Sequence, residues 1–266
     1  MVSKNGPAKF IRFAISKDAE PTTAHGLWGM LDGEHVIETP GPFRKDFAED
    51  HTLASVKLLP PVAPSKIVCV GRNYVDHAKE LGNEVPTEPL IFLKPPSSIV
   101  GNGDAIVYPQ QSALVHFEGE IGLVIGKRAR HVKAEEAMDY IFGYTCVNDV
   151  TARDFQKKDG QWTRGKGFDT FCPVGPWVVA KEELALDEIV LRSRRNGELK
   201  QEGKPSEMIF NVGAILAFVT SFLTLEPGDL IATGTPAGVG PLEPGDTVSV
   251  EIEGLGTLTN PVVKEQ

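Results

Sequence analysis

Two carboxylates stand close together in a stretch of the sequence that is otherwise apolar. The segment His116-Phe-Glu-Gly-Glu-Ile-Gly-Leu-Val-Ile125 places Glu118 and Glu120 two residues apart. On a strand, alternate residues share a face, so His116, Glu118 and Glu120 point to the same side. Four apolar residues then point into the core: Phe117, Ile121, Leu123 and Ile125. Two carboxylates on one face of a buried strand repel each other unless protons or a cation neutralise them. A solvent-facing edge strand with ordinary charges explains this segment equally well.

A third carboxylate favours a site that binds a cation over a solvent-facing edge strand. Tyr144-Thr-Cys-Val-Asn-Asp149 is another apolar run that ends in an acidic residue. The following Thr151-Ala-Arg-Asp154 matches a helix capping box, which gives Asp154 a structural role and leaves Asp149 without one. Three carboxylates without cysteine or clear histidine spacing suit a hard ion, Mg²⁺ or Mn²⁺, with Ca²⁺ also compatible. The sequence therefore predicts a metal site with positions open for water and substrate.

A histidine and a glutamate stand three residues apart in a segment that predicts a short helix. Asn73 is expected to be its N-cap, and Gly82 follows its C-terminus. His77 and Glu80 share a face of such a helix. A carboxylate beside an imidazole fixes the tautomer of the ring and raises its basicity, as a general base requires. An exposed helix with an incidental pair explains the same two residues.

The charge of the chain limits the classes of partner. The formal net charge is −9, from 36 acidic and 27 basic residues. Nucleic acid and anionic membranes require a basic surface, so neither is an expected partner. An anionic small molecule would need local positive charge from a metal ion and a few cations. The candidates are Arg72, Lys94, Arg153, Arg164 and Lys166, of which Arg164 is expected to be a solvated surface residue.

These residues must be positioned by a fold that reads as β-rich α+β. Residues 1–60 contain short strand patterns at 10–15 and 25–31, and they predict a small N-terminal β-rich domain. A proline-rich break at residues 60–64 precedes the larger part, 61–266, which begins with a buried strand at 66–71. Most of that part reads as strands and turns, with helical patches at 134–140, 151–156 and 211–223.

Six motifs in register resemble the signature motifs of the fumarylacetoacetate hydrolase superfamily. They are Cys69-Val-Gly-Arg-Asn-Tyr-Val-Asp-His77, Phe92-Leu-Lys-Pro95, Glu118-Gly-Glu120, Asn148-Asp-Val-Thr-Ala-Arg-Asp154, Trp162-Thr-Arg-Gly-Lys166 and Thr233-Gly-Thr-Pro236. Their order and spacing agree from about residue 60 to the C-terminus. Residues before that point carry no motif of the family. The resemblance implies a mixed β-sandwich roll with a small N-terminal domain.

The resemblance also implies roles for particular residues. The residues that bind the divalent metal in the family map onto Glu118, Glu120 and Asp149. The catalytic His–Glu dyad of the family, which lies on a short lid helix, maps onto His77 and Glu80. The remaining expected positions are Lys166 as the catalytic lysine, and Arg72, Arg153, Gln156 and Thr235 as substrate-binding residues. His116 is compatible with two roles, a partner of a ligand glutamate or a member of a polar pocket wall.

The expected activity is metal-dependent cleavage of a carbon–carbon bond in a small 2-oxo acid. Hydrolysis of an acylpyruvate or fumarylpyruvate and decarboxylation of an oxaloacetate-like acid use the same enolate. The alternative is an isomerase or tautomerase of a hydroxymuconate-type diacid in aromatic catabolism, which needs only proton transfer. A non-catalytic metal-binding protein is the third alternative, although it would have no use for the dyad and the lysine together.

The remaining expectations concern the location of the protein in the cell, its cysteines and its oligomeric state. The N-terminus lacks the apolar stretch of a secretory signal, which predicts a cytoplasmic protein. The three cysteines are widely spaced beside apolar residues and are expected to be buried. Resemblance to the family implies a homodimer.

Overall fold

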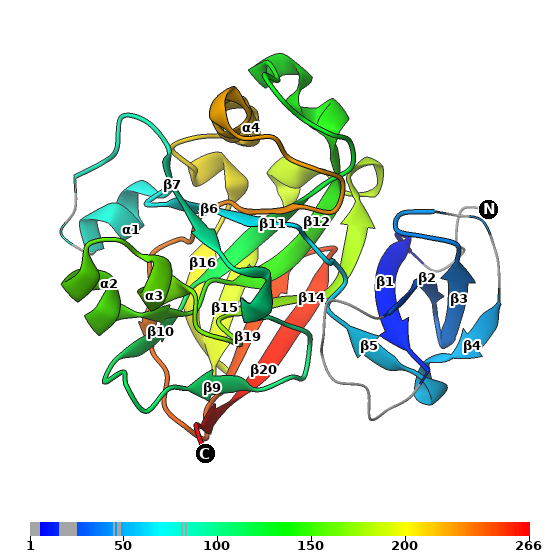
Figure 1. The fold of residues 1–266 in the computed structure, drawn as a ribbon, viewed down its shortest axis with the longest axis horizontal. Coiled ribbons are helices and arrows are strands. Elements are labelled where there is room, and N and C mark those ends of the chain that lie inside the picture. The colour runs from blue at the N-terminus through cyan, green and yellow to red at the C-terminus, as the bar shows by residue number, and fades with distance from the viewer. Residues whose placement is uncertain (1–5, 16–25, 45, 47–48, 81, 83) are drawn as a thin grey trace.

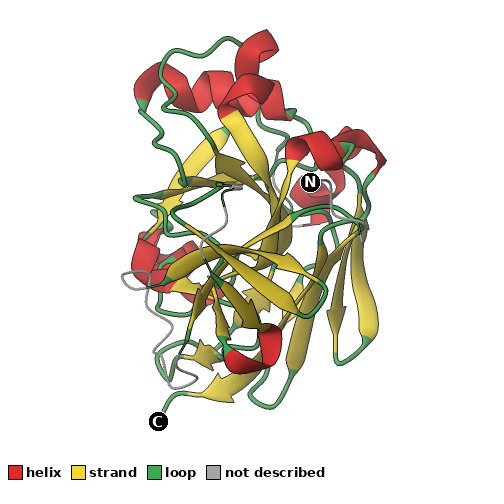
Figure 2. Ribbon diagram, turned by 90° about the vertical axis from the view of Figure 1, so that its right-hand side faces the viewer, coloured by secondary structure: helices red, strands yellow, loops and turns green. Residues whose placement is uncertain are grey.

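Strands are the most abundant secondary structure among the described residues and form three sheets, as the ribbon views show (Figures 1 and 2). The computed structural model describes residues 6–15, 26–44, 46, 49–80, 82 and 84–266. The sheets have twelve, three and five strands, and the helices lie around them. The predicted β-rich α+β class is confirmed. Among the described residues, no helix is long and apolar enough to cross a membrane.

The largest sheet runs in the order β4-β3-β2-β1-β14-β12-β11-β17-β6-β7, with β5 beside β1 and β8 beside β14. Most of its neighbouring strands are antiparallel, and β6–β17 and β8–β14 are parallel. Its strands are β1 (Lys9–Ala14), β2 (Leu27–Asp32), β3 (His35–Thr39), β4 (Asp50–Thr52), β5 (Lys57–Leu59), β6 (Ile67–Gly71), β7 (Leu90–Lys94), β8 (Ile99–Val100), β11 (Gly119–Ile125), β12 (Ile141–Asn148), β14 (Cys172–Ala180) and β17 (Leu230–Ala232).

The N-terminal strands form a lobe at one side of the molecule (Figure 1). Strand β1 pairs with β2 and β5 within the lobe and also with β14 of the main body. The large sheet therefore continues from the lobe into the rest of the chain. The expected strand at 10–15 matches β1, and the start of the one expected at 25–31 lies outside the described residues. The division of the chain at residue 60 stays a prediction.

The two smaller sheets complete the body. The three-stranded sheet consists of β10 (Val115–Phe117), β13 (Thr151–Ala152) and β18 (Gly240–Pro241). The five-stranded sheet consists of β9 (Ile106–Tyr108), β15 (Leu191–Arg195), β16 (Glu198–Gly203), β19 (Thr247–Ile252) and β20 (Gly256–Lys264). Strands β15, β19 and β20 pack against β11, β12 and β14, so the centre of the large sheet is covered on that face. All seven residues of β11 are buried, since Val124 on its other face packs into a second core cluster with Ile67 and Val178.

The helices are short, and α4 (Val212–Phe222) is the longest of those described. It packs its buried Ile215, Leu216 and Val219 into the same core cluster as Ile121 and Leu123 of β11. The others are α1 (Val75–Glu80), α2 (Arg153–Asp159), α3 (Thr163–Lys166), and the 3₁₀ turns η1 (Leu53–Ser55), η2 (Pro96–Ser98), η3 (Ala134–Tyr140), η4 (Lys181–Glu183), η5 (Leu186–Glu188) and η6 (Pro205–Glu207). Asn211 caps α4 by accepting a hydrogen bond from the Ala214 N–H.

Two capping predictions are wrong. Helix α1 begins at Val75, and the Asn73 amide instead binds the backbone of Phe210 and Thr233, which ties the start of α1 to two distant segments. Thr151 lies in β13 and donates to the Asp149 carbonyl oxygen. The Asp154 carboxylate accepts from the Ser112 hydroxyl and the Ala113 N–H, so tertiary partners replace the capping box.

The expected strand through residues 116–125 is broken at Glu118. Strand β10 ends at Phe117 and pairs with β13 and β18, whereas β11 begins at Gly119 and pairs with β12 and β17. The chain passes from one sheet to another at this point. Phe117 consequently packs in a different core cluster from Ile121, contrary to the prediction of one continuous apolar face.

Candidate active site

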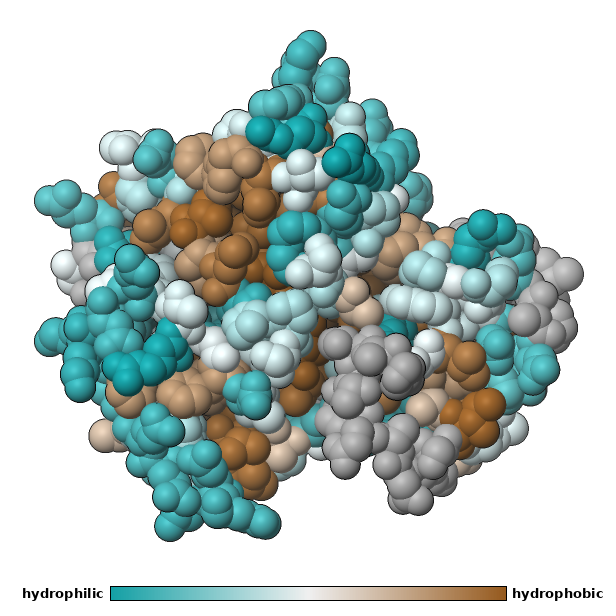
Figure 3. Space-filling view, viewed as in Figure 1, coloured by the Kyte–Doolittle hydropathy of each residue, from teal (hydrophilic) through white to brown (hydrophobic). Residues whose placement is uncertain are grey.

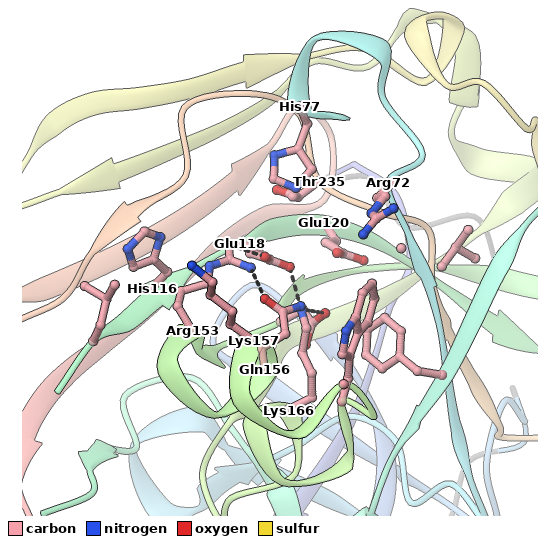
Figure 4. A pocket seen from close by; sticks show the side chains of 17 residues that line it. Arg72, His77, His116, Glu118, Glu120, Arg153, Gln156, Lys157, Lys166 and Thr235 are labelled. Carbon is pink, nitrogen blue, oxygen red and sulfur yellow. Dashed lines mark hydrogen bonds and ion pairs between the residues drawn. The ribbon is translucent and has the colours of Figure 1, made fainter. Parts of the chain in front are cut away.

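A cavity of about 540 Å³ lies beside the junction of β10 and β11. Its wall contains nine of the ten site residues expected from the sequence: Arg72, His77, Glu118, Glu120, Asp149, Arg153, Gln156, Lys166 and Thr235. The tenth, Glu80, lies directly behind His77. In Figure 4 the side chains of His77, Glu120 and Lys166 converge from α1, β11 and the α2–α3 region. The structure thus brings together residues spread over more than 150 positions of the sequence.

Three buried carboxylates form the floor of the cavity. Glu118, Glu120 and Asp149 each offer an oxygen, and these oxygens all lie within 4.8 Å of one another. The pairing of β11 with β12 sets this arrangement, since Gly119 stands opposite Asn148 and the Asp149 N–H donates to the Glu118 carbonyl oxygen over 2.8 Å. Each of the three residues is at most 4% exposed, which excludes a solvated edge strand.

Glu118 is paired with two cations. Its carboxylate contacts the Arg153 guanidinium and accepts a hydrogen bond of 2.7 Å from the Lys166 Nζ. Burial alone would raise the pKa of Glu118, but the charges of Arg153 and Lys166 outweigh it and hold this pKa below its ordinary value. Glu118 is therefore ionised at neutral pH. Arg153 thus pairs with this glutamate in the structure, and its expected contact with substrate stays a prediction.

Asp149 is held between two lysines. Lys94 donates to its Oδ1 over 2.6 Å, and Lys166 donates to its Oδ2 over 2.6 Å. Lys166 is buried, which disfavours its charged form, but the charges of Asp149 and Glu118 more than compensate and raise its pKa. Lys166 is thus a charged ammonium that bridges two of the three carboxylates, and it confirms the expected concentration of positive charge at the site.

Glu120 lacks such a partner. Within the described part of the chain, no cation forms an ion pair with it, and its Oε2 accepts only the Gly234 N–H, over 2.8 Å. Gly234 has a φ of 100°, and a Cβ there would lie 2.6 Å from the Cβ of Asn73, so this close approach requires glycine. Burial and the charges of Asp149 and Glu118 raise the pKa of Glu120 well above its ordinary value. The set of three carboxylates is therefore short of positive charge at Glu120, which fits a hard divalent cation.

The His77–Glu80 pair is present as expected. His77 is buried on α1 and its Nδ1 lies 3.3 Å from the Glu80 Oε2. Glu80 also accepts the Gly238 N–H, over 3.1 Å, and this contact fixes the carboxylate relative to the 233–240 loop. The ring nitrogen Nε2 of His77 has no partner among the described residues, and the side chain lines the cavity. The pair can accept and return a proton there.

The hydroxyl of Thr235 is already engaged within the protein. It donates to the Gly119 carbonyl oxygen over 2.8 Å and accepts from the Gln201 amide over 2.7 Å. The same Gln201 accepts the Gly119 N–H and donates to Pro236, so this buried amide braces the backbone between the two glutamates. The sequence carried no signal for Gln201. The expected substrate contact of Thr235 stays a prediction.

Arg72 lines the side of the cavity that lies opposite His116, near Glu120 (Figure 4). It has a φ of 56°, and its guanidinium lies 5.9 Å from the ring centre of Trp162. Gln156 accepts a hydrogen bond of 3.0 Å from Arg153 and also lines the cavity.

Arg164 pairs with Asp159 at the surface, as expected. All three cysteines are buried, as expected.

His116 projects into the cavity from β10. Its Nδ1 is buried without a hydrogen-bond partner among the described residues. Burial and the nearby charge of Arg153 lower the pKa of His116 to about 4, so the ring is neutral at pH 7. Of its two expected roles, the position in a polar pocket wall matches the structure, because His116 forms no hydrogen bond to a glutamate that the structure describes.

A family model described as fumarylacetoacetate (FAA) hydrolase, C-terminal, matches residues 66–263. Among relatives in sequence, the mitochondrial oxaloacetate tautomerase fahd2 of Xenopus laevis is 47% identical over 242 residues, which cover 87% of this chain and 76% of that protein.

Two solved structures extend the comparison. The 2-hydroxyhepta-2,4-diene-1,7-dioate isomerase from Mycobacterium marinum is 46% identical, with a TM-score of 0.85 over 97% of this chain and 98% of that one. The maleylpyruvate hydrolase from Sphingobium sp. SYK-6, in complex with manganese(II) and pyruvate, is 29% identical, with a TM-score of 0.79 over 97% and 100% of the two chains.

Proposed function

The chain belongs to the fumarylacetoacetate hydrolase family, and we propose that it interconverts the keto and enol forms of a small 2-oxo acid with the help of Mg²⁺ or Mn²⁺. The observation that carries the proposal is one cavity in which three buried carboxylates, a buried lysine and a His–Glu pair converge. A non-catalytic metal-binding protein would need only the carboxylates. The proposal places the tautomerase alternative ahead of carbon–carbon cleavage.

Glu118, Glu120 and Asp149 would hold the divalent ion. The ion would add the positive charge that Glu120 lacks, and three carboxylate oxygens are the ligands that Mg²⁺ and Mn²⁺ prefer. A manganese complex of the maleylpyruvate hydrolase supports the same class of ion. When bound, the ion would supply Lewis-acid chemistry that draws electron density from the 2-oxo group.

The protein side chains would perform the proton transfer. Enolisation removes a proton from C3 of the 2-oxo acid and places one on the 2-oxygen, and ketonisation reverses both steps. His77 faces the cavity with Nε2 free and would accept or deliver the C3 proton. Glu80 would hold the ring in one tautomer. The ammonium of Lys166 would stabilise the negative charge that develops on the oxygen.

The names of the relatives favour this order of alternatives. Proteins with 46–47% identity are named as a tautomerase and an isomerase, while the hydrolase is 29% identical. Hydrolysis of an acylpyruvate is the second candidate function. The His77–Glu80 pair favours it specifically, because the same free Nε2 could deprotonate a water molecule.

One assay separates the candidates. Enolic oxaloacetate, acetylpyruvate, fumarylpyruvate and hydroxymuconates would be supplied with Mg²⁺ or Mn²⁺, and enol absorbance and pyruvate release would be followed together. Enol loss above the spontaneous rate without pyruvate supports the tautomerase. Pyruvate formed in step with enol loss supports hydrolysis or decarboxylation. If neither signal exceeds the protein-free control for any compound, the proposed function is wrong.

A further inference from the structure

One end of the cavity carries polar groups that the proposed chemistry does not use. His116 lies on β10 between Val115 and Phe117, which are fully buried on the opposite face. Its pairing with Thr151 of β13 and Pro241 of β18 fixes the strand from both sides. Because neighbouring residues of a strand point in opposite directions, the imidazole turns into the cavity. Figure 4 shows it beside Arg153, on the other side of Glu118 from Arg72.

The groups around His116 are donors, and two of them are cationic. Arg153 is 10% exposed; it pairs with Glu118 and donates to Gln156, while its Nε has no hydrogen-bond partner among the described residues. Lys157 follows on α2, lines the cavity and forms no ion pair within the described part of the chain. This end therefore carries two positive charges against the single carboxylate of Glu118.

Unpartnered buried polar atoms are costly unless a ligand or water satisfies them. Both the Nδ1 of His116 and the Nε of Arg153 are in this condition. An anionic oxygen-bearing group would satisfy both and would match the positive charge. Leu114, which directly precedes β10, lines the cavity and gives an apolar wall for a short carbon chain.

We propose, on the basis of the proposed function, that His116 and Lys157 bind a second carboxylate at the far end of the substrate, so that the site selects 2-oxo diacids over 2-oxo monoacids. The 2-oxo end would lie at the three carboxylates, and the distal carboxylate would lie between His116, Lys157 and Arg153. His116 is then a specificity residue that contacts substrate and takes no part in proton transfer.

The test compares two ligands that differ only in the distal group. Trimethylpyruvate is a monoacid, and 3,3-dimethyloxaloacetate replaces one of its methyl groups by a carboxylate; neither has a proton at C3, so neither can enolise. Binding to the Mg²⁺-loaded protein would be measured by the ligand-dependent rise in unfolding temperature. His116→Phe and Lys157→Ala should each weaken diacid binding tenfold to a hundredfold, the usual effect of a lost charged hydrogen bond. Binding of the monoacid should stay unchanged.

Lys158→Ala is the matched control, since Lys158 is the next residue of α2 and does not line the cavity. It should bind both ligands as the wild type does. Equal weakening of both ligands in His116→Phe would overturn the proposal, because His116 would then only shape the cavity. Unchanged diacid binding in both variants would overturn it as well. Failure of the proposed function is seen separately, as absence of enol turnover in a wild-type protein that still prefers the diacid.

Discussion

The Nζ of Lys166 lies 2.6 Å from the Oδ2 of Asp149, and the same ammonium reaches Glu118 over 2.7 Å. Two of the three carboxylates expected to hold a metal are thus bridged by a protein cation. A divalent ion held by these carboxylates would compete with the lysine for the same oxygens, so we expect metal binding and the position of Lys166 to be coupled. Glu120 has no cationic partner among the described residues and is the carboxylate that would gain most from such an ion.

Lys166→Met should separate the bridging of the carboxylates by the lysine from the binding of a metal ion. Removal of the ammonium leaves Glu118 and Asp149 close together and buried, so the metal-free variant should be less stable by roughly 3 kcal/mol. Added Mg²⁺ or Mn²⁺ should restore more stability to the variant than to the wild type, while enol turnover falls by about a hundredfold or more. Chemical denaturation with and without metal checks this. Lys158→Met is the control, and equal metal stabilisation of the variant and the wild type contradicts the coupling.

The His77–Glu80 pair predicts a second result. His77→Ala and Glu80→Gln should each reduce keto–enol turnover by about a hundredfold, the range expected for a positioned acid–base group. Metal affinity should stay unchanged in both, since neither residue belongs to the carboxylate set. Turnover at the wild-type rate would mean that the base has been misassigned. Decarboxylation needs no such base, so a smaller loss in that reaction would support the assigned role.

The pKa of His116 predicts a dependence of stability on pH. The folded protein holds this pKa at about 4, below the ordinary 6.5, so the unfolded chain binds more protons between these values. Stability from this residue is therefore full above pH 6.5 and is lost as the pH falls toward 4. The wild type should lose about 1 kcal/mol more than His116→Asn between pH 7 and pH 5, allowing for partial exposure of the ring. Urea unfolding of metal-free protein at the two pH values measures this difference, and equal losses would refute it.

A homodimer is expected from the family, and one face is suited to it. Strand β7 ends the large sheet, and its Leu93 is 49% exposed. Hydrophobic residues gather around β6 and β7 in Figure 3. Leu93→Glu should shift the protein from dimer to monomer in sedimentation, whereas Leu199→Glu, a comparably exposed leucine of β16, should not. If the wild type is a monomer at micromolar concentration, the dimer prediction is wrong. The assignment of the three carboxylates does not depend on this result.

Much of the site could be predicted because its chemistry is local in the sequence. Glu118 and Glu120 share one short segment, and His77 and Glu80 share one helical turn, so spacing made each pair a candidate. The resemblance to the family then favoured the site over the alternatives that spacing left open. The buried lysine was also foreseen, as part of a search for local positive charge. Its bridge between Glu118 and Asp149 required coordinates.

The failed predictions concern residues whose partners lie far away in the chain. Asn73 was expected to cap its own helix but binds Phe210 and Thr233, and Asp154 was expected to cap α2 but binds Ser112 and Ala113. Gln201 was missed because its partners, Gly119 and Thr235, lie more than thirty residues away on either side. A local pattern cannot choose between a nearby backbone group and a distant one that burial brings equally close.

The metal-dependent mechanism is tested most directly by the rate of enolic oxaloacetate loss in chelator-treated protein, measured before and after addition of Mg²⁺ or Mn²⁺. For the wild type we expect the spontaneous rate in excess EDTA and full recovery with metal. Recovery should fail for Glu120→Gln, since that glutamate completes the carboxylate set. It should succeed for Glu135→Gln, which alters an exposed carboxylate of η3 outside the cavity. Full activity of the wild type in excess EDTA would contradict the metal-dependent mechanism.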